Sequence, residues 1–229
     1  MKKITTRLLS LVLLGAFIPS FVLAETWDLG KGDITVTATE TSQTVSQVNG
    51  DSKVDDNPVI TSNGTATSNT ITIEAAAGAE ANVTLENVNI NTGGAAITTS
   101  GDGSVNIELD GANKVQSGTY HAGVEKTNDG TLTITDTDQD NGSLTATGGQ
   151  RGAGIGGGYQ ASSSNITISG GKVTANGGQW AAGIGGGEDG NGSHITIEGG
   201  TVTANGGYGA AGIGGGTNIP WRTLAKAKI

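Results

Sequence analysis

Three aspartates at alternate positions, Asp136, Asp138 and Asp140, follow the ligand spacing of a calcium-binding loop. Carboxylate oxygens two residues apart can converge on one Ca²⁺ ion. The match is partial, because such a loop has Gly at its sixth position and Glu at its twelfth, where this chain has Asn141 and Thr147. Calcium is therefore the one candidate cofactor, and a solvated acidic turn without a metal is the favoured interpretation.

Planar and amide side chains gather at one position of the sequence when it is aligned on an apolar ladder, Val124, Ile155, Ile184 and Ile213. Four or five residues before the ladder come Tyr120, Arg151, Gln179, Trp180 and Tyr208. Sugar rings stack on aromatic rings, and their hydroxyls hydrogen-bond polar side chains. We predict a carbohydrate-binding site here, with a polysaccharide or surface glycan as partner. The alternative is that Trp180 and Tyr208 only cover a glycine-rich backbone.

No arrangement of residues points to catalysis. Glu188, Asp189 and Glu198 contain the carboxylates of a possible glycosidase pair, but nothing sets their separation, and solvated turns are expected instead. His121 and His194 are expected to be isolated surface residues. We therefore expect a protein that is not an enzyme.

Composition excludes several other classes of protein. The chain has 41 Gly among 229 residues, with 3% aromatic, 14% charged and 34% hydrophobic residues, which argues against an ordinary helical protein and against disorder. The absence of Cys excludes disulfides and thiolate metal sites. The Gly154–Gly158 run lacks the Gly-Lys-Ser/Thr ending and the helix of a phosphate loop.

Residues 1–24 have the three parts of a secretory signal peptide. Three cations precede an apolar run over 8–18, and Val22 and Ala24 are small residues placed for cleavage before Glu25. The transmembrane alternative is weaker, because the wider apolar segment from Leu8 to Ala24 has only about 17 residues, short of a membrane span, and contains Pro19. Loss of these three cations lowers the net charge from −9 to −12, which disfavours a nucleic-acid partner. We expect a secreted or cell-surface protein with no membrane span after cleavage.

The residues named above must be positioned by an internal repeat. Ile155, Ile184 and Ile213 are 29 residues apart, and each repeat adds two further alternating segments, such as Ile166-Thr-Ile168 and Lys172-Val-Thr-Ala175. Val115, Leu144, Val173 and Val202 are expected to occupy equivalent positions. Gly-Gly pairs follow the strands at turns that favour positive φ, and Asn176 and Asn205 are expected to stack as a hydrogen-bonded ladder.

A parallel β-solenoid explains this pattern best, with one strand per sheet in each coil and coils about 4.8 Å apart. The competing fold is a sandwich of antiparallel hairpins, since Gly-Gly turns also suit hairpins. We expect an N-terminal cap with the first strands over 25–70, regular coils over 71–216, and a C-terminal tail over 217–229, either a short cap or the end of a truncated reading frame.

Three segments carry a family resemblance: Gly142-Ser-Leu-Thr-Ala-Thr-Gly-Gly149, Gly152-Ala-Gly-Ile-Gly-Gly-Gly158, and Ile166 to Gly178. Their sequence resembles the glycine-rich repeat domains near the N-termini of large cell-surface proteins of Gram-positive anaerobic bacteria. This resemblance implies an all-β fold similar to the right-handed parallel β-helix of pectate-lyase-like proteins. It also implies a surface location and adhesion or glycan binding, and it supplies no catalytic residues.

Four functions remain open from the sequence. An adhesion or carbohydrate-binding module comes first, and a structural spacer within a larger surface protein comes second. A polysaccharide lyase or hydrolase is less favoured. An ice-binding surface is a minor alternative, because Thr145, Thr174 and Thr203 form an outward column and only one good Thr column is visible.

Overall fold

The computed structural model describes residues 24–48, 50, 52–138 and 142–217, which form three β-sheets. The predicted signal peptide, apart from Ala24, and the predicted tail, apart from Thr217, lie outside the described residues.

Each sheet is a stack of short strands from successive turns of the chain. Sheet A contains, in order, β1 (Thr26–Asp28), β5 (Val59–Thr61), β7 (Glu80–Glu86), β10 (Ser104–Asp110), β13 (Leu132–Thr135), β16 (Ile166–Ile168) and β19 (Ile195–Ile197). Sheet B contains β21 (Ile213–Gly214), β18 (Ile184–Gly185), β15 (Ile155–Gly156), β12 (Val124–Lys126), β9 (Ile97–Ser100), β6 (Ile71–Ala75), β2 (Ile34–Ala38), β3 (Gln43–Gln47) and β4 (Ser52–Val54). Sheet C contains β20 (Thr201–Asn205), β17 (Lys172–Asn176), β14 (Ser143–Thr147), β11 (Ala112–Gln116) and β8 (Asn89–Asn91).

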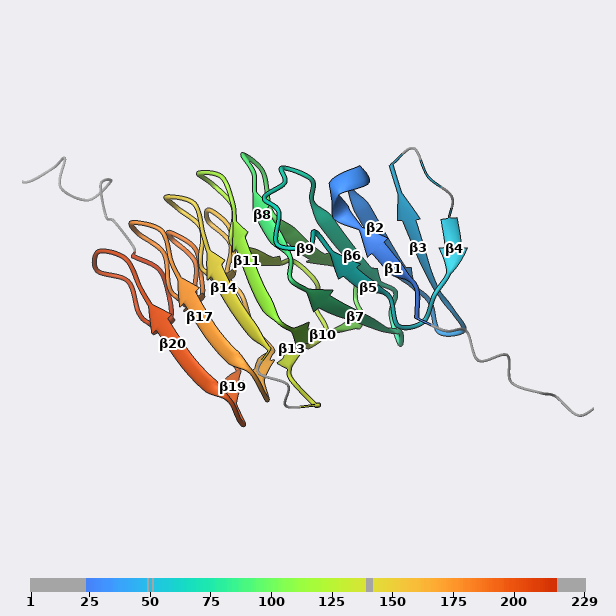
Figure 1. Ribbon diagram of the computed structural model, residues 1–229. Helices are drawn as coiled ribbons and strands as arrows, with labels where there is room; N and C mark the ends of the chain where they lie inside the picture. The colour runs from blue at the N-terminus through green and yellow to red at the C-terminus, as the bar shows by residue number, and fades with distance from the viewer. Residues whose placement is uncertain (1–23, 49, 51, 139–141, 218–229) are drawn as a thin grey trace, which may run out of the picture.

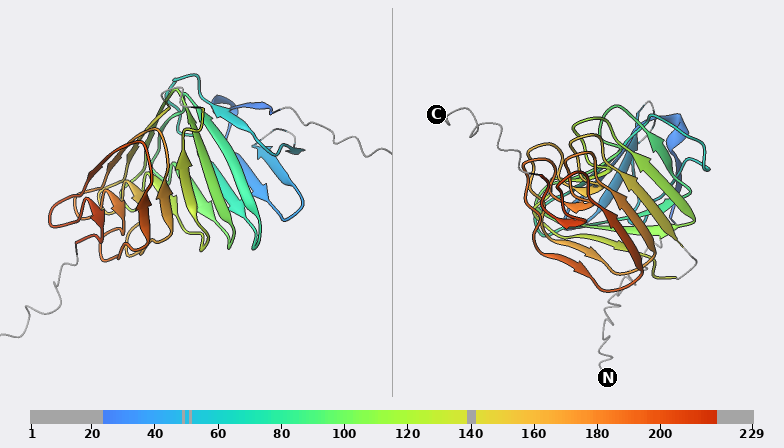
Figure 2. Two further views of the ribbon diagram at one scale, coloured as in Figure 1. Left: turned by 90° about the horizontal axis from the view of Figure 1, so that it is seen from below. Right: turned by 90° about the vertical axis from the view of Figure 1, so that its left-hand side faces the viewer.

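The chain visits sheets B, A and C in turn, so that each circuit makes one coil. About six coils of about 29 residues stack in this way, and the chain advances from blue to red along the stack (Figure 1). Seen from the C-terminal end, the coils lie one behind another (Figure 2, right). The predicted parallel β-solenoid is confirmed, and the antiparallel sandwich is excluded.

The apolar ladder forms one column of the core. Val124 pairs with Ile155, Ile155 with Ile184, and Ile184 with Ile213, each in parallel register. The first three are fully buried, whereas Ile213 is 47% exposed because no described coil covers it. The alternation of buried and half-buried residues along β10 and β14 shows how Ile, Val and Leu side chains face inward at every second position.

The N-terminal end of the stack is closed differently from the rest. β2 pairs with β3, and β3 with β4, in antiparallel register. Residues Leu29–Lys31 form a short 3₁₀ helix. The sequence showed one alternating segment here, Ile34 to Thr37, but the structure also places β1, β3, β4 and β5 before residue 62. Their polar residues weakened the alternation.

One predicted register is wrong by two residues. Val115 pairs with Ala146 rather than with Leu144, whose partner in that coil is Asn113. Asn113 is buried, and its amide donates to the carbonyl oxygens of Leu85, Asp110 and Ser143 while its Oδ1 accepts from the Val88 amide. A fully hydrogen-bonded Asn thus takes a core position that the apolar pattern assigned to an aliphatic side chain.

The Gly-Gly pairs have two different physical causes. Gly171 and Gly200, at the turns into β17 and β20, have positive φ angles of 72° and 76°, as predicted. Gly178 and Gly207, which follow β17 and β20, do not have positive φ. Glycine occurs there because a Cβ on Gly178 would overlap the carbonyl oxygen of Gly149 in the preceding coil, and a Cβ on Gly207 would overlap that of Gly178.

The polar ladders predicted on the surface are present. The Asn205 side-chain amide donates to the Asn176 Oδ1 at 2.8 Å. Thr145, Thr174 and Thr203 pair in one column on sheet C. A second column, not noticed in the sequence, consists of Thr133, Thr167 and Thr196 on sheet A. Because the two columns lie on different sheets, they do not form one flat threonine surface.

Candidate functional site

The predicted carbohydrate-binding residues lie in the loops that lead from sheet C to sheet B. These loops, after β11, β14, β17 and β20, are stacked one above another along the solenoid (Figure 1). Backbone hydrogen bonds join them: the Arg151 amide donates to the Thr119 carbonyl at 2.8 Å, and the Tyr208 amide donates to the Gln179 carbonyl at 2.6 Å. Equivalent residues of successive coils are therefore placed side by side, as the 29-residue spacing predicted.

Arg151 lies at the centre of a group of aromatic rings. Its guanidinium carbon is 5.8 Å from the centroid of the Tyr120 ring, 5.6 Å from the Trp180 ring and 4.8 Å from the Tyr159 ring. These distances fall within the range of cation–π attraction. The Tyr120 and Tyr159 rings are themselves 5.7 Å apart, tilted by 52°. The structure thus brings together three of the predicted residues, Tyr120, Arg151 and Trp180.

Two residues of this group, Tyr159 and Glu188, were not assigned to it from the sequence. They lie in the loops after β15 and β18, which come back beside the loops that carry Arg151 and Trp180: the Tyr159 amide donates to the Tyr120 carbonyl at 2.7 Å, and the Glu188 amide to the Arg151 carbonyl at 2.9 Å. Both residues stand four positions after the ladder isoleucines, Ile155 and Ile184. Aligning the positions that follow the ladder, as well as those that precede it, would have found them.

Glu188 corrects the expectation of a solvated turn. Its side chain is only 6% exposed, and its Oε2 lies 3.3 Å from the Nη1 of Arg151, whose own side chain is 31% exposed. The pair therefore holds a cation and an anion together beside the aromatic rings. Asp189 and Glu198 are exposed, as expected.

The remaining predicted residues extend the group along the stack. The Gln150 side-chain amide donates to the Gln179 Oε1 at 3.0 Å, joining two exposed glutamines of successive coils. Tyr208 lies one coil beyond Trp180, and it is 81% exposed. We call the surface formed by these residues the aromatic corner: Tyr120, Arg151, Tyr159, Gln179, Trp180 and Tyr208.

His121, next to the aromatic corner, is not isolated as expected. Its Nδ1 lies 3.0 Å from the Oε2 of Glu125, and the same oxygen accepts the Ala122 amide at 2.9 Å. The carboxylate therefore fixes the end of the loop that leads into β12. His194 is exposed and has a positive φ of 49°.

Comparison with known proteins supports the fold. The family model described as a beta helix repeat matches residues 140–159, 166–188 and 195–217, and these stretches include Arg151, Trp180 and Tyr208. The chain forms a parallel β-helix. No curated protein and no solved structure shows a significant match to it. No helix in the described part of the β-helix is long and apolar enough to cross a membrane.

The predicted calcium-binding residues lie on another surface of the β-helix. Asp136 and Asp138 approach Glu108 of the preceding coil, and each of the three offers an oxygen within 4.8 Å of the others. Asp140 lies outside the described residues. Glu108 was not predicted, because it is 28 residues before Asp136 and is brought there only by the pairing of β10 with β13. Its carboxylate accepts hydrogen bonds from the Thr137 amide and hydroxyl.

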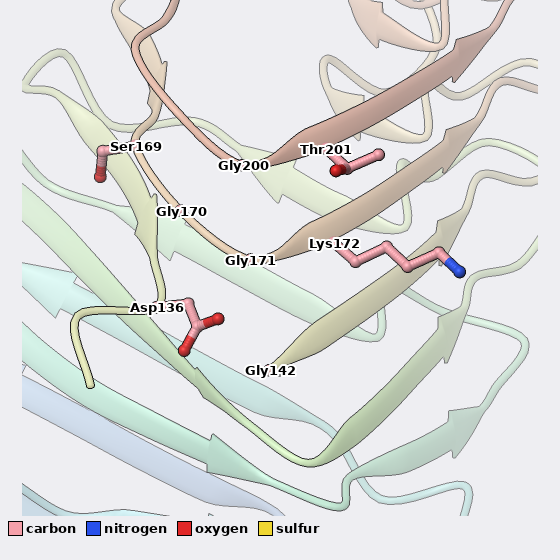
Figure 3. Close-up of a pocket in the computed structure, with 8 residues that line it drawn as sticks. All are labelled: Asp136, Gly142, Ser169, Gly170, Gly171, Lys172, Gly200 and Thr201. Atoms are coloured by element: carbon pink, nitrogen blue, oxygen red, sulfur yellow. The ribbon is translucent and has the colours of Figure 1, made fainter. Parts of the chain in front are cut away.

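Two hollows adjoin this acidic cluster, Glu108, Asp136 and Asp138. The larger, of about 560 Å³, lies at the corner between sheets A and C and is lined by Asp136, Gly142, Ser169, Gly170, Gly171, Lys172, Gly200 and Thr201 (Figure 3). The Lys172 side chain extends away from Asp136 (Figure 3). The second, of about 390 Å³, lies over sheet A; it includes Glu108 and shares Ser169 with the first. Neither hollow includes a residue of the aromatic corner.

Lys126 is a charged residue inside the β-helix. It ends β12, is buried, and donates from its Nζ to the Asn128 carbonyl. Asn128 is held by the Thr99 hydroxyl and by the carbonyls of Gly103 and Gly130. Burial lowers the pKa of Lys126 below 10.5, although the negative charge of Asp129 opposes this shift. This polar network fills a turn and has no connection to the aromatic corner.

Proposed function

We propose that this β-helix is a secreted, cell-surface module that binds an extended polysaccharide at the aromatic corner and serves in adhesion. The observation that carries this proposal is the row of planar side chains that successive coils present in register: Tyr120, Arg151 with Tyr159, Trp180 and Tyr208. Equivalent positions repeat at about 4.8 Å per coil.

The shape of the aromatic corner suits a polymer. Its members come from four successive coils, so the surface runs along the solenoid axis for about 14 Å between Tyr120 and Tyr208. Tyr120 is 55% exposed and Tyr208 more so, which leaves ring faces open to a sugar. A small molecule needs a concave pocket that buries most of its surface, whereas a chain of sugars gains from repeated shallow contacts.

The hydrogen-bonding groups also suit sugars. The exposed Gln150 and Gln179 amides adjoin the rings and match the hydroxyl groups of a polysaccharide. Each contact excludes little water, so one module binds weakly. Many copies on one surface would raise the apparent affinity through effective concentration.

The proposal does not include cleavage. A glycosidase needs a protonated acid and a second carboxylate on either side of the glycosidic oxygen. Glu188, the carboxylate that contacts the corner, is buried and paired with Arg151. It is therefore poorly placed to donate a proton to a bound sugar.

A pull-down on insoluble polysaccharides tests the proposal. We expect the parent protein to be retained, and retention to fall at least about tenfold for Trp180→Ala and by less for Tyr208→Ala, since losing a stacked ring costs roughly 0.5–1.5 kcal/mol beyond its buried area. Val54→Ala is the matched control, because Val54 is exposed on β4 at the other end of the stack. Equal retention of all four proteins would show that the aromatic corner is not the binding site. No retention of the parent on any polysaccharide would favour a structural spacer instead.

A further inference from the structure

We infer that the aromatic corner selects uncharged polysaccharides over polyuronates, and that the Arg151–Glu188 pair sets this preference. The inference rests on the proposed function and names the class of polymer. The reason is the charge that a bound chain would meet.

The cation of the corner is already neutralised. Arg151 Nη1 lies 3.3 Å from Glu188 Oε2, and the carboxylate is almost fully buried. The ion pair lacks hydrogen-bond geometry at Glu188 Oε2, so its contribution is mainly charge compensation. A sugar carboxylate approaching Arg151 would therefore meet a pair with no net charge.

The guanidinium also lies among aromatic rings. Rings of Tyr120, Tyr159 and Trp180 surround it at 4.8 to 5.8 Å from Cζ. Recognition of a carboxylate by arginine is strongest when two parallel N–H groups reach both oxygens. The rings lie around Arg151, and Glu188 lies on one side of it. This arginine therefore supports and orients the rings, and it offers a ligand few paired N–H groups.

The charges around the corner repel anions. Asp189, directly after Glu188, is exposed, and Glu125 lies beside His121 near the start of the corner. The chain after the predicted cleavage carries a net charge of −12. Charges within about 8–10 Å act on a bound chain at ordinary ionic strength, so these carboxylates would oppose uronate groups bound near them.

The groups that remain for a ligand are uncharged. They are the ring faces and hydroxyls of the tyrosines, the Trp180 indole, and the amides of Gln150 and Gln179. Such groups match a neutral glucan or mannan, whose polar groups are hydroxyls and acetal oxygens without charge.

Removing the compensating anion tests the inference. Retention is measured on an insoluble neutral glucan and on polygalacturonate coupled covalently to beads, in EDTA and at low salt, for the parent, Glu188→Gln and Asp189→Asn. Asp189→Asn is the matched control: it removes the same charge one residue away, and Asn tolerates the positive φ of 62° found there. We expect the parent to bind only the glucan, and Glu188→Gln to gain at least about fivefold on polygalacturonate over Asp189→Asn, because it leaves the Arg151 charge uncompensated.

Two results would overturn the inference. One is equal or stronger retention of the parent on polygalacturonate, with that retention lost in Trp180→Ala; the site would then be right and the class of polymer wrong. The other is an equal response of Glu188→Gln and Asp189→Asn, which would show that Arg151 does not set the preference. Failure of the proposed function gives another result: the parent is not retained on glucan, or Trp180→Ala is retained as well as the parent.

Discussion

At the scale of single residues, the stacking of coils explains why this chain needs so much glycine. Gly178 lies directly against the Gly149 carbonyl of the preceding coil, and Gly207 lies in the same way against Gly178. The next residues in the chain, Gln179 and Tyr208, are exposed and carry the polar and aromatic groups of the corner. The sequence predicted the aromatic row from its spacing, but it assigned these glycines to positive φ, because close approach of backbones leaves no signal in a single sequence.

We expect Gly178→Ala to lower the free energy of unfolding by about 3 kcal/mol, since its Cβ would overlap backbone that cannot move without separating two coils. Gly94→Ala is the control, because a Cβ there meets no atom within 4 Å and its φ is not positive. We expect its effect to stay within about 0.5 kcal/mol. Urea denaturation measures both, and equal effects would contradict the packing argument.

The acidic cluster carries a second prediction at this scale. The sequence favoured an acidic turn without a metal, but the structure adds the Glu108 carboxylate to Asp136 and Asp138. With this third carboxylate we propose a Ca²⁺ site, because three carboxylates that repel one another are stabilised by a cation that binds the folded form. Millimolar calcium should raise the melting temperature of the parent and have a smaller effect on Glu108→Gln. If calorimetry detects no heat of calcium binding and the melting temperature does not change, an acidic turn without a metal is the correct interpretation.

At the scale of strands, the aliphatic columns hold the coils in register, and most of them could be predicted from the 29-residue period. The Ile155, Ile184 and Ile213 column was predicted because identical residues recur at identical spacing. The Val115 register was not, because β11 buries Asn113 where later coils bury Leu144 and Val173. A polar residue with all its hydrogen bonds made inside the core looks like a surface residue in a sequence.

Burial along this column predicts a graded response to charge. Ile184→Asp should cost about 4 kcal/mol or more, because it places an unpaired carboxylate in the fully buried core. Ile213→Asp is the same substitution at an end of the column that is half exposed, and it should cost far less. Thermal melting of the two variants gives the comparison. Similar decreases in melting temperature would contradict the placement of Ile184 inside the column and Ile213 at its end.

Lys126 on β12 makes stability depend on pH. Its pKa in the folded protein is lower than its ordinary 10.5, so the unfolded chain binds more protons in the interval between the two values. Below that interval Lys126 is charged in both states, and the cost of burying the charge lowers the free energy of unfolding by its full amount. This cost disappears as the pH rises through the interval between the two pKa values. The parent should therefore gain stability relative to Lys126→Met between pH 7 and 10.5. A difference in unfolding free energy that stays constant over this range would contradict a buried, charged Lys126.

At the scale of the whole molecule, one end of the stack is closed by the antiparallel β3 and β4, and successive coils extend from it in one direction (Figure 2, left). This arrangement turns a sequence period into a linear surface. Residues 88 positions apart, Tyr120 and Tyr208, thus belong to one row. The sequence predicted that row because the period alone determines it, whereas Tyr159 and Glu188 depend on how a second set of loops returns to the same corner.

The length dependence of oligosaccharide binding tests the central claim most directly. Soluble neutral oligosaccharides of increasing length are titrated against the protein, with affinity followed by calorimetry. If the aromatic corner binds one chain along the stack, affinity should rise with each added sugar until the ligand spans the ~14 Å from Tyr120 to Tyr208, and then level off. In Trp180→Ala that rise should stop at shorter ligands. No binding at any length, or an affinity for a single sugar as high as that for the longest oligosaccharide, would contradict an extended polysaccharide site.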